Sequence, residues 1–173
     1  MTQHDSWLQL SRRALLGRPD ASGASRRAIE DLIIAYAWLI DTGDFAGVGA
    51  LLGAGIVTGG GPPMTGAAAI EQFYRDTLIL YEDGTPKTRH IVSNILVDVD
   101  DEAGTAIARS SFTALQAVSG LSLQPIAAGR YDDRFERRDG KWCFVERRMH
   151  TELVGDLTHH LQPAVLRRIS WPG

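Results

Sequence analysis

The clearest periodic pattern in the chain is a helical one that begins near Ser25. Apolar residues recur there at every third or fourth position, which predicts an amphipathic helix, and they are Ile29, Leu32, Ile33, Tyr36 and Ile40. Ser25 is a candidate N-cap, and Thr42 and Gly43 would end the helix. The pattern further predicts a short helix over residues 45–52, a brief strand over 56–58 and a third helix over 65–81.

After Gly84 the pattern changes from helical to β-type. Four segments rich in β-branched and aromatic residues are separated by turn signals, and they cover residues 90–99, 105–118, 125–137 and 141–151. Asp139-Gly140 between the last two segments is a strong hairpin signal. Helices followed by antiparallel strands indicate an α+β fold in which the helices cover one face of a bent sheet.

The two ends of the chain carry weaker patterns. Residues 1–24 contain Pro, Gly and Ser and predict a flexible lead-in. A last helix is expected over 156–160, with Asp156 as its N-cap and Pro163 beyond its end. The length of 173 residues suits one core, so we expect a single domain over residues 25–160 and a tail over 161–173.

Composition narrows the class of protein. A hydrophobic content of 44% with 23% charged residues is typical of a folded globular chain. The net charge of −3 gives no reason to expect nucleic acid or an anionic membrane as a partner. The apolar runs are too short to span a bilayer, and the acidic Asp5 before the first apolar patch does not fit a signal peptide. A cytoplasmic protein is therefore expected.

Cofactor and metal motifs are not found in the sequence. The single cysteine, Cys143, allows no internal disulfide. The glycine-rich stretches lack the strand–turn–helix context of nucleotide sites, and the histidines match no metal-binding spacing. We expect neither a cofactor nor a metal.

Asp41 and His90 are candidates for proton chemistry. Asp41 ends the first helix at the edge of its apolar stripe, and its position alone favours an ordinary surface carboxylate. His90 opens a strand rich in Ile and Val, where a structural histidine is the commoner case. If the two side chains met, the carboxylate would fix the imidazole tautomer and stabilise its charged form, and the imidazole could then act as a base near neutral pH.

Arg147 and Tyr36 are candidates for supporting roles. Alternation along the last strand places Arg147 on the same, more apolar side as Val145 and Met149. A buried arginine needs either an anionic transition state or a carboxylate partner, and Asp133 could be that partner; both interpretations stay open. Tyr36 lies on the helical stripe, where most tyrosines are simply core, but its hydroxyl could donate to a leaving oxygen or a carbonyl.

Six short motifs follow one another between residues 26 and 160. They are Ala28-Ile-Glu-Asp-Leu, Ile40-Asp41-Thr-Gly-Asp-Phe45, Gly66-x-x-x-Ile70-x-x-Phe73-Tyr74, Thr88-Arg-His90-x-x-x-Asn94, Gly129-Arg-Tyr131-x-Asp133 and Phe135-Glu-Arg-Arg-Asp-Gly-Lys-Trp142. In order and spacing they resemble the SnoaL-like branch of the nuclear transport factor 2-like superfamily. The resemblance implies a cone, in which N-terminal helices wrap a curved antiparallel sheet around an internal pocket.

The resemblance also implies site residues. The Asp–His pattern is similar to that of hexachlorocyclohexane dehydrochlorinase and scytalone dehydratase, which places a catalytic pair on Asp41 and His90 and an assisting arginine on Arg147. Tyr36 stands where the dehydrochlorinase has a lysine, and it suits an oxygen leaving group or a carbonyl better than a halide. A serine, Ser110 or Ser111, replaces the second histidine of the dehydratase. Because of these departures, the substrates of the two enzymes cannot be assigned to this chain.

The resulting hypothesis is a small-molecule lyase or isomerase of the dehydratase, isomerase or cyclase type. His90 would remove a proton from an apolar or polycyclic substrate held in a mostly apolar pocket. The expected substrate-binding residues are Trp38, Phe73, Phe112, Tyr131 and Asp133.

Two other functions remain open from the sequence. Relatives with this cone include the small subunit of ring-hydroxylating dioxygenases, so a non-catalytic binding or accessory subunit is one alternative. An epoxide hydrolase-like site that activates water through an Asp–Arg–Asp set is the other, with Asp133 and Arg147 as two of its members. An exposed sheet face and the C-terminal tail favour a homo-oligomer, either a dimer or a trimer.

Overall fold

The computed structural model describes residues 23–59 and 61–168. Its helices are α2 (Gly23–Asp41), α3 (Phe45–Leu52), α4 (Ala67–Thr77) and α5 (Pro163–Leu166). Its strands are β1 (Ile56–Thr58), β2 (Met64–Thr65), β3 (Thr88–Asp100), β4 (Thr105–Val118), β5 (Leu121–Arg138) and β6 (Lys141–Val154). Helices precede the long strands, so the predicted α+β class is confirmed.

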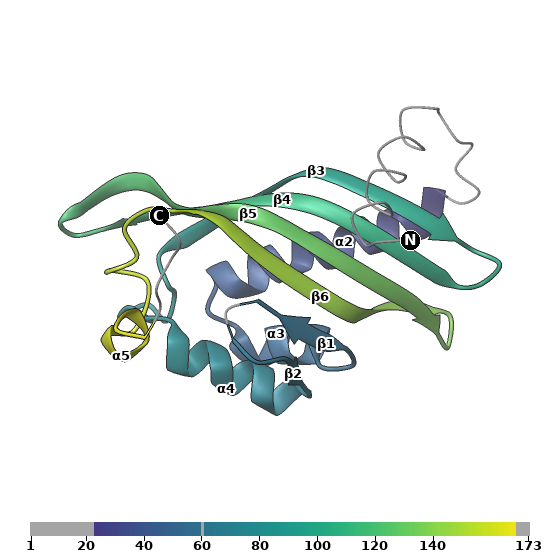
Figure 1. Cartoon of the computed structure of the whole chain (residues 1–173), viewed down its shortest axis with the longest axis horizontal. Helices are drawn as coiled ribbons and strands as arrows, with labels where there is room; N and C mark the ends of the chain where they lie inside the picture. The colour runs from purple at the N-terminus through teal and green to yellow at the C-terminus, as the bar shows by residue number, and fades with distance from the viewer. Residues whose placement is uncertain (1–22, 60, 169–173) are drawn as a thin grey trace.

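The six strands form one curved sheet in the order β2-β1-β6-β5-β4-β3. All neighbouring strands are antiparallel except β1 and β6, which run parallel. Figure 1 shows α2, α3 and α4 on the same side of the sheet. The Asp139-Gly140 turn joins β5 to β6 with positive φ at both residues, as a tight hairpin requires.

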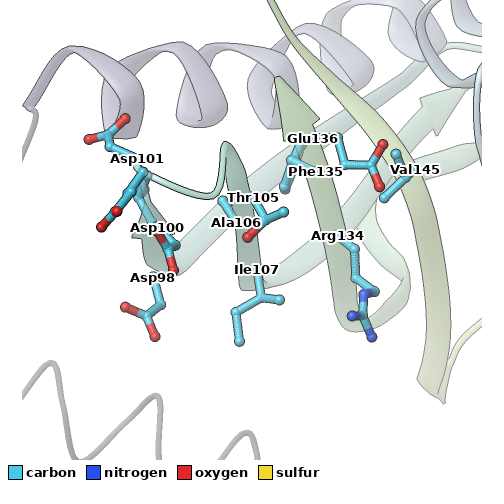
Figure 2. A pocket seen from close by; sticks show the side chains of 12 residues that line it. Asp98, Asp100, Asp101, Thr105, Ala106, Ile107, Arg134, Phe135, Glu136 and Val145 are labelled. Atoms are coloured by element: carbon cyan, nitrogen blue, oxygen red, sulfur yellow. The ribbon is translucent and has the colours of Figure 1, made fainter. Parts of the chain in front are cut away.

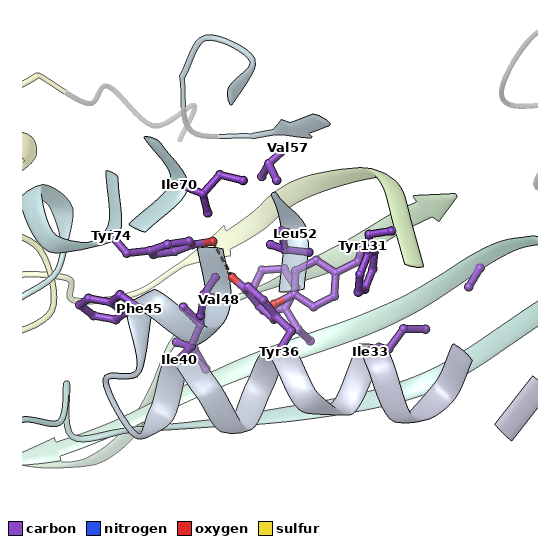
Figure 3. Packing of buried hydrophobic residues seen from close by; sticks show 14 of the residues in the cluster. Ile33, Tyr36, Ile40, Phe45, Val48, Leu52, Val57, Ile70, Tyr74 and Tyr131 are labelled. Atoms are coloured by element: carbon purple, nitrogen blue, oxygen red, sulfur yellow. Dashed lines mark hydrogen bonds between the residues drawn. The ribbon is translucent and has the colours of Figure 1, made fainter. Parts of the chain in front are cut away.

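The core lies between α2 and the inner face of the sheet. Ile29, Ile33 and Ile40 on α2 are each no more than 2% exposed, and burial of such a side chain contributes roughly 1.5–3 kcal/mol. Aromatic rings from the strands and from α4 complete the core, and Figure 3 shows Tyr36 on α2 directed toward Tyr74 on α4. The helical stripe that the sequence predicts is therefore the face that α2 buries.

Three local predictions are wrong. Ser25 lies within α2, which begins at Gly23, and its hydroxyl donates to Asp101 rather than capping the helix. The third helix ends at Thr77, because Leu78 is extended and bridges to Leu161. Residues 156–160 are not helical, and a turn covers 158–160.

The turn that replaces the last predicted helix has a clear cause. The carboxylate of Asp156 accepts hydrogen bonds from the backbone and hydroxyl of Thr158, which favours a turn over a helix start. The helix α5 begins at Pro163, because proline suits the first helical turn. Of the predicted lead-in, residues 1–22 lie outside the described residues, and Gly23 and Ala24 open α2.

A bulge interrupts the alternation of β6. Phe135 pairs with Phe144 whereas Arg134 pairs with Glu146, so Val145 is an extra residue in β6. Phe144 and Arg147 are consequently both buried although their positions differ by an odd number. The full burial of Arg147 confirms its predicted inward position, although the bulge breaks the strict alternation on which the prediction was based.

Candidate active site

A mostly apolar cavity of about 510 Å³ opens beside α2, α4 and the inner face of the sheet. This volume is typical of small-molecule sites. Its polar lining groups include Tyr36, Tyr74, His90, His160 and Arg168. Among its apolar lining residues are Ile40, Phe73, Leu78, Phe112, Tyr131, Met149, Leu157, Leu161 and Val165.

A second hollow of about 530 Å³ lies near the β3–β4 turn (Figure 2). Acidic side chains dominate its rim, including Asp98, Asp100, Asp101 and Glu136. None of the predicted site residues lines it. The predicted site residues that line a cavity therefore line the first one.

Asp41 and His90 meet at the wall of the cavity. The His90 Nδ1 atom lies 2.7 Å from Oδ1 of Asp41, and the His90 backbone N–H donates to Oδ2 at 2.7 Å. The Thr88 hydroxyl donates to Oδ1 at 2.8 Å. Burial raises the pKa of Asp41, but these hydrogen bonds outweigh burial and hold it below its ordinary value. The carboxylate is therefore ionised and oriented from three directions.

The bond to Asp41 fixes the state of the imidazole. An ionised carboxylate accepts from Nδ1, so the proton of the neutral ring sits on Nδ1 and Nε2 keeps its lone pair. His90 lines the cavity. A lone pair on Nε2 of a cavity-lining histidine is what a base acting on a bound molecule would need.

Two tyrosine hydroxyls lie together in the same cavity. The hydroxyl oxygens of Tyr36 and Tyr74 are 2.9 Å apart (Figure 3), and the Tyr36 hydroxyl also donates to the Met149 sulfur at 3.6 Å. Burial raises the pKa of both tyrosines, although the charge of Arg147 opposes the rise. Both groups are neutral hydrogen-bond donors at physiological pH.

Arg147 and Asp133 form a two-pronged ion pair behind the cavity wall. Both side chains are fully buried, with N–O distances of 2.9 and 2.7 Å. The guanidinium carbon lies 4.5 Å from the ring centre of Tyr36 and 4.3 Å from that of Tyr131. Burial lowers the pKa of Arg147, but the Asp133 carboxylate raises it by more. The net pKa lies above the ordinary value, so the guanidinium stays charged.

This geometry corrects two expectations. Neither Arg147 nor Asp133 is among the cavity-lining residues, because the rings of Tyr36 and Tyr131 lie over the guanidinium. The structural ion pair, one of the two interpretations left open by the sequence, is the one that the geometry matches.

Trp38 does not line the cavity, contrary to prediction. It is 60% exposed, and the guanidinium of Arg89 lies 5.6 Å from its ring centre. Trp38 follows Tyr36 by two helical positions and therefore points to the opposite side of α2. Phe73, Phe112 and Tyr131 do lie in the cavity wall.

The sequence analysis missed His160. Its ring lines the cavity, and burial, followed by the charge of His90, lowers its pKa to about 4. His160 lies in a turn, at the end of the segment for which a helix was predicted. The available signal was the apolar trio Leu157, Leu161 and Val165 around it, which also lines the cavity.

Comparison with known proteins assigns the family. The model of the SnoaL-like domain matches residues 22–148. The chain belongs to the SnoaL-like family. No curated protein matches this SnoaL-like chain in sequence.

Solved structures with the same fold differ in what they are described as doing. A candidate scytalone dehydratase from Novosphingobium aromaticivorans is 26% identical, with a TM-score of 0.60 over 76% of this chain and 87% of that one. LinA is 22% identical, with a TM-score of 0.62 over 78% and 90%. The β subunit of a candidate aromatic-ring-hydroxylating dioxygenase from N. aromaticivorans is 14% identical, with a TM-score of 0.62 over 82% and 98%. The likeness to the last two shows the SnoaL-like fold alone.

Proposed function

We propose that this SnoaL-like protein is a small-molecule lyase or isomerase in which His90 removes a proton from a C–H group of an apolar substrate. The observation that carries the proposal is the hydrogen-bonded Asp41–His90 pair at the wall of an apolar cavity. Similarity to a candidate scytalone dehydratase supports the same class of reaction.

The proposed chemistry starts at Nε2 of His90. This nitrogen takes the proton, and the electron pair of the broken C–H bond passes to the substrate. Asp41 holds the Nδ1–H and stabilises the imidazolium that forms. The electron pair then expels a leaving group from the neighbouring carbon, or the imidazolium returns the proton to a different carbon. The first outcome is an elimination and the second an isomerisation.

The tyrosine pair supplies stabilisation for negative charge on an oxygen. One of the two hydroxyl protons lies in the hydrogen bond between Tyr36 and Tyr74, and the other is donated to the Met149 sulfur. Because a thioether sulfur is a weak acceptor, this second proton would turn to a carbonyl or leaving oxygen of a bound substrate. The Arg147 guanidinium lies under the Tyr36 and Tyr131 rings and positions them without touching the substrate. Arg147 is therefore proposed as a positioning residue.

Proton abstraction is testable without the natural substrate. In D₂O, the wild-type protein should accelerate exchange of the acidic C–H protons of 1-tetralone, an apolar bicyclic ketone, as followed by ¹H NMR. His90→Ala should reduce this acceleration by about 10²-fold or more, which is typical for loss of a general base. His150→Ala is the matched control, since His150 does not line the cavity and its Nε2 lies 3.2 Å from Oδ2 of Asp132.

Two results would contradict the proposal. Equal exchange rates for wild type and His90→Ala would show that His90 is not the base. Binding of 1-tetralone without any accelerated exchange would instead favour a non-catalytic binding subunit. An epoxide hydrolase-like site gains no support, because Asp133 and Arg147 do not line the cavity.

A further inference from the structure

The cavity contains a second imidazole, His160, whose position is fixed by its own backbone. The His160 N–H donates to the Leu157 carbonyl at 3.0 Å, and the His160 carbonyl accepts from the Ile79 N–H at 2.9 Å. The next residue, Leu161, bridges to Leu78 at the end of α4. Backbone contacts therefore hold the ring in the cavity wall.

The two nitrogens of the His160 ring differ in accessibility. Nδ1 is buried and has no hydrogen-bond partner within residues 23–59 and 61–168. A neutral imidazole has one N–H and one lone pair, and a buried N–H without an acceptor is rarer than an unpaired acceptor. The proton is therefore assigned to Nε2, the other ring nitrogen of this cavity-lining residue.

We propose that His160 is a substrate-binding residue whose Nε2–H donates a hydrogen bond to an oxygen of the substrate. The preferred substrates would then carry a carbonyl or hydroxyl oxygen near the acidic C–H, rather than being pure or halogenated hydrocarbons. The assignment of the reacting carbon to His90 rests on the proposed function, whereas the hydrogen bond from His160 requires no turnover.

The two histidines complement each other chemically. His90 presents a lone pair to the cavity because its Nδ1–H is engaged by Asp41, whereas His160 presents an N–H. With its pKa near 4, His160 stays neutral at physiological pH and adds no positive charge to oppose protonation of His90. One cavity thus offers a base and a neutral donor.

The test compares two probes that differ by one oxygen, 1-tetralone and its hydrocarbon counterpart tetralin. Calorimetry gives the ratio of their affinities for wild type and for His160→Phe, which keeps an aromatic ring but removes the donor. The ketone preference should fall roughly 3- to 10-fold in His160→Phe, the value of one hydrogen bond. His160→Gln, whose amide N–H can replace Nε2–H, should restore part of the preference.

Further variants separate the possible failures. His90→Ala should lose proton exchange but keep the ketone preference. The binding test of His160 can therefore be interpreted even if the proposed function is wrong. The proposal would be overturned if the ketone preference were unchanged in His160→Phe, or if it were lost in Tyr36→Phe and not in His160→Phe. It would also be overturned if neither 1-tetralone nor tetralin bound to the wild-type protein. If His160→Phe fails to fold, ¹⁵N NMR of the His160 ring in the wild-type protein replaces it. The Nε2 signal should shift when 1-tetralone is added but not when tetralin is added. Equal responses to the two probes would overturn the proposal.

Discussion

His160 illustrates how burial can fix the protonation state of a side chain. Its Nδ1 has no hydrogen-bond partner among the described residues, and removal from water favours the neutral imidazole. The opposite holds for Asp41, where three hydrogen bonds keep a largely buried carboxylate ionised. A cavity-lining imidazole and a carboxylate behind the cavity wall thus have different charge states for different physical reasons.

The neutral state of His160 predicts a loss of stability in mild acid. Between the ordinary histidine pKa of about 6.5 and the folded value of about 4, the unfolded chain binds a proton that the folded chain does not. The free energy of unfolding should therefore fall as the pH decreases through this window, by roughly 3 kcal/mol from this group. Urea titrations at pH 7.0, 5.5 and 4.5 should show a shallower fall for His160→Gln. An identical pH dependence of the free energy of unfolding in wild type and His160→Gln would refute this prediction.

The Arg147–Asp133 pair predicts a large effect on stability. Arg147→Met leaves the Asp133 carboxylate buried without a partner, which typically costs about 3–5 kcal/mol. The double variant Asp133→Leu/Arg147→Met should recover much of this loss in urea denaturation, because no buried charge remains at this position. The exposed Arg75–Glu71 pair on α4 is the control, and Arg75→Ala should cost less than about 1 kcal/mol. Similar costs for Arg147→Met and Arg75→Ala would contradict the interpretation.

At the scale of elements, the end of α2 determines where Asp41 lies. Gly43 has a φ of +74°, and a Cβ at this position would lie 2.1 Å from the Gly84 carbonyl oxygen. Only glycine allows both the left-handed backbone and this close approach. The Thr42-Gly43 stop that the sequence predicts is thus also a packing contact that sets Asp41 beside β3.

The Gly43 contact can be tested against a matched glycine. Gly84 has a similar φ of +76°, but a Cβ added there would meet open space. Gly84→Ala should therefore cost only the backbone strain, about 1–2 kcal/mol, whereas Gly43→Ala should cost clearly more in urea denaturation. The 1-tetralone exchange rate should fall only in Gly43→Ala, since Asp41 is displaced. Equal behaviour of the two variants would show that the contact does not matter.

Local patterns predicted most of the elements, and long-range contacts account for the failures. The stripe on α2, the short helix α3 and the turns between the strands depend on neighbouring residues. Ser25 and Leu78 were misjudged because their partners, Asp101 and Leu161, are far away in sequence. The bulge at Val145 likewise depends on pairing across two strands.

The candidate site was predictable only in part, for the same reason. Asp41 lies at the edge of an apolar stripe, and only the family motifs paired it with His90, 49 positions away. Periodicity correctly turned Arg147 inward but could not choose between an ion pair and a substrate contact. His160 belongs to no motif. A turn far from the other site residues in sequence brings it back to the cavity, and local patterns do not show this.

At the scale of the whole molecule, the cavity combines two parts of the chain. The SnoaL-like match ends at residue 148 and includes Tyr36, Asp41 and His90. The cavity wall beyond the match is built from Met149, Thr151, Leu157, His160, Leu161, Val165 and Arg168. Backbone hydrogen bonds between Gln162 and Thr77 and between Ile79 and His160 fasten this segment to the end of α4. The proposed proton-abstracting pair and the proposed hydrogen-bond donor His160 thus come from separate stretches of sequence.

The parallel pairing of β1 with β6 has a consequence for the order of assembly during synthesis. Ile56 lies beside Glu146, so one edge of this early strand stays unpaired until the last long strand forms, although β2 pairs with its other edge. Translation delivers the N-terminal half first, and such long-range contacts slow folding. The parts of α2 and α3 that pack against β6 are therefore uncovered in the nascent chain until β6 emerges. During this interval the protein is most exposed to aggregation and to chaperones.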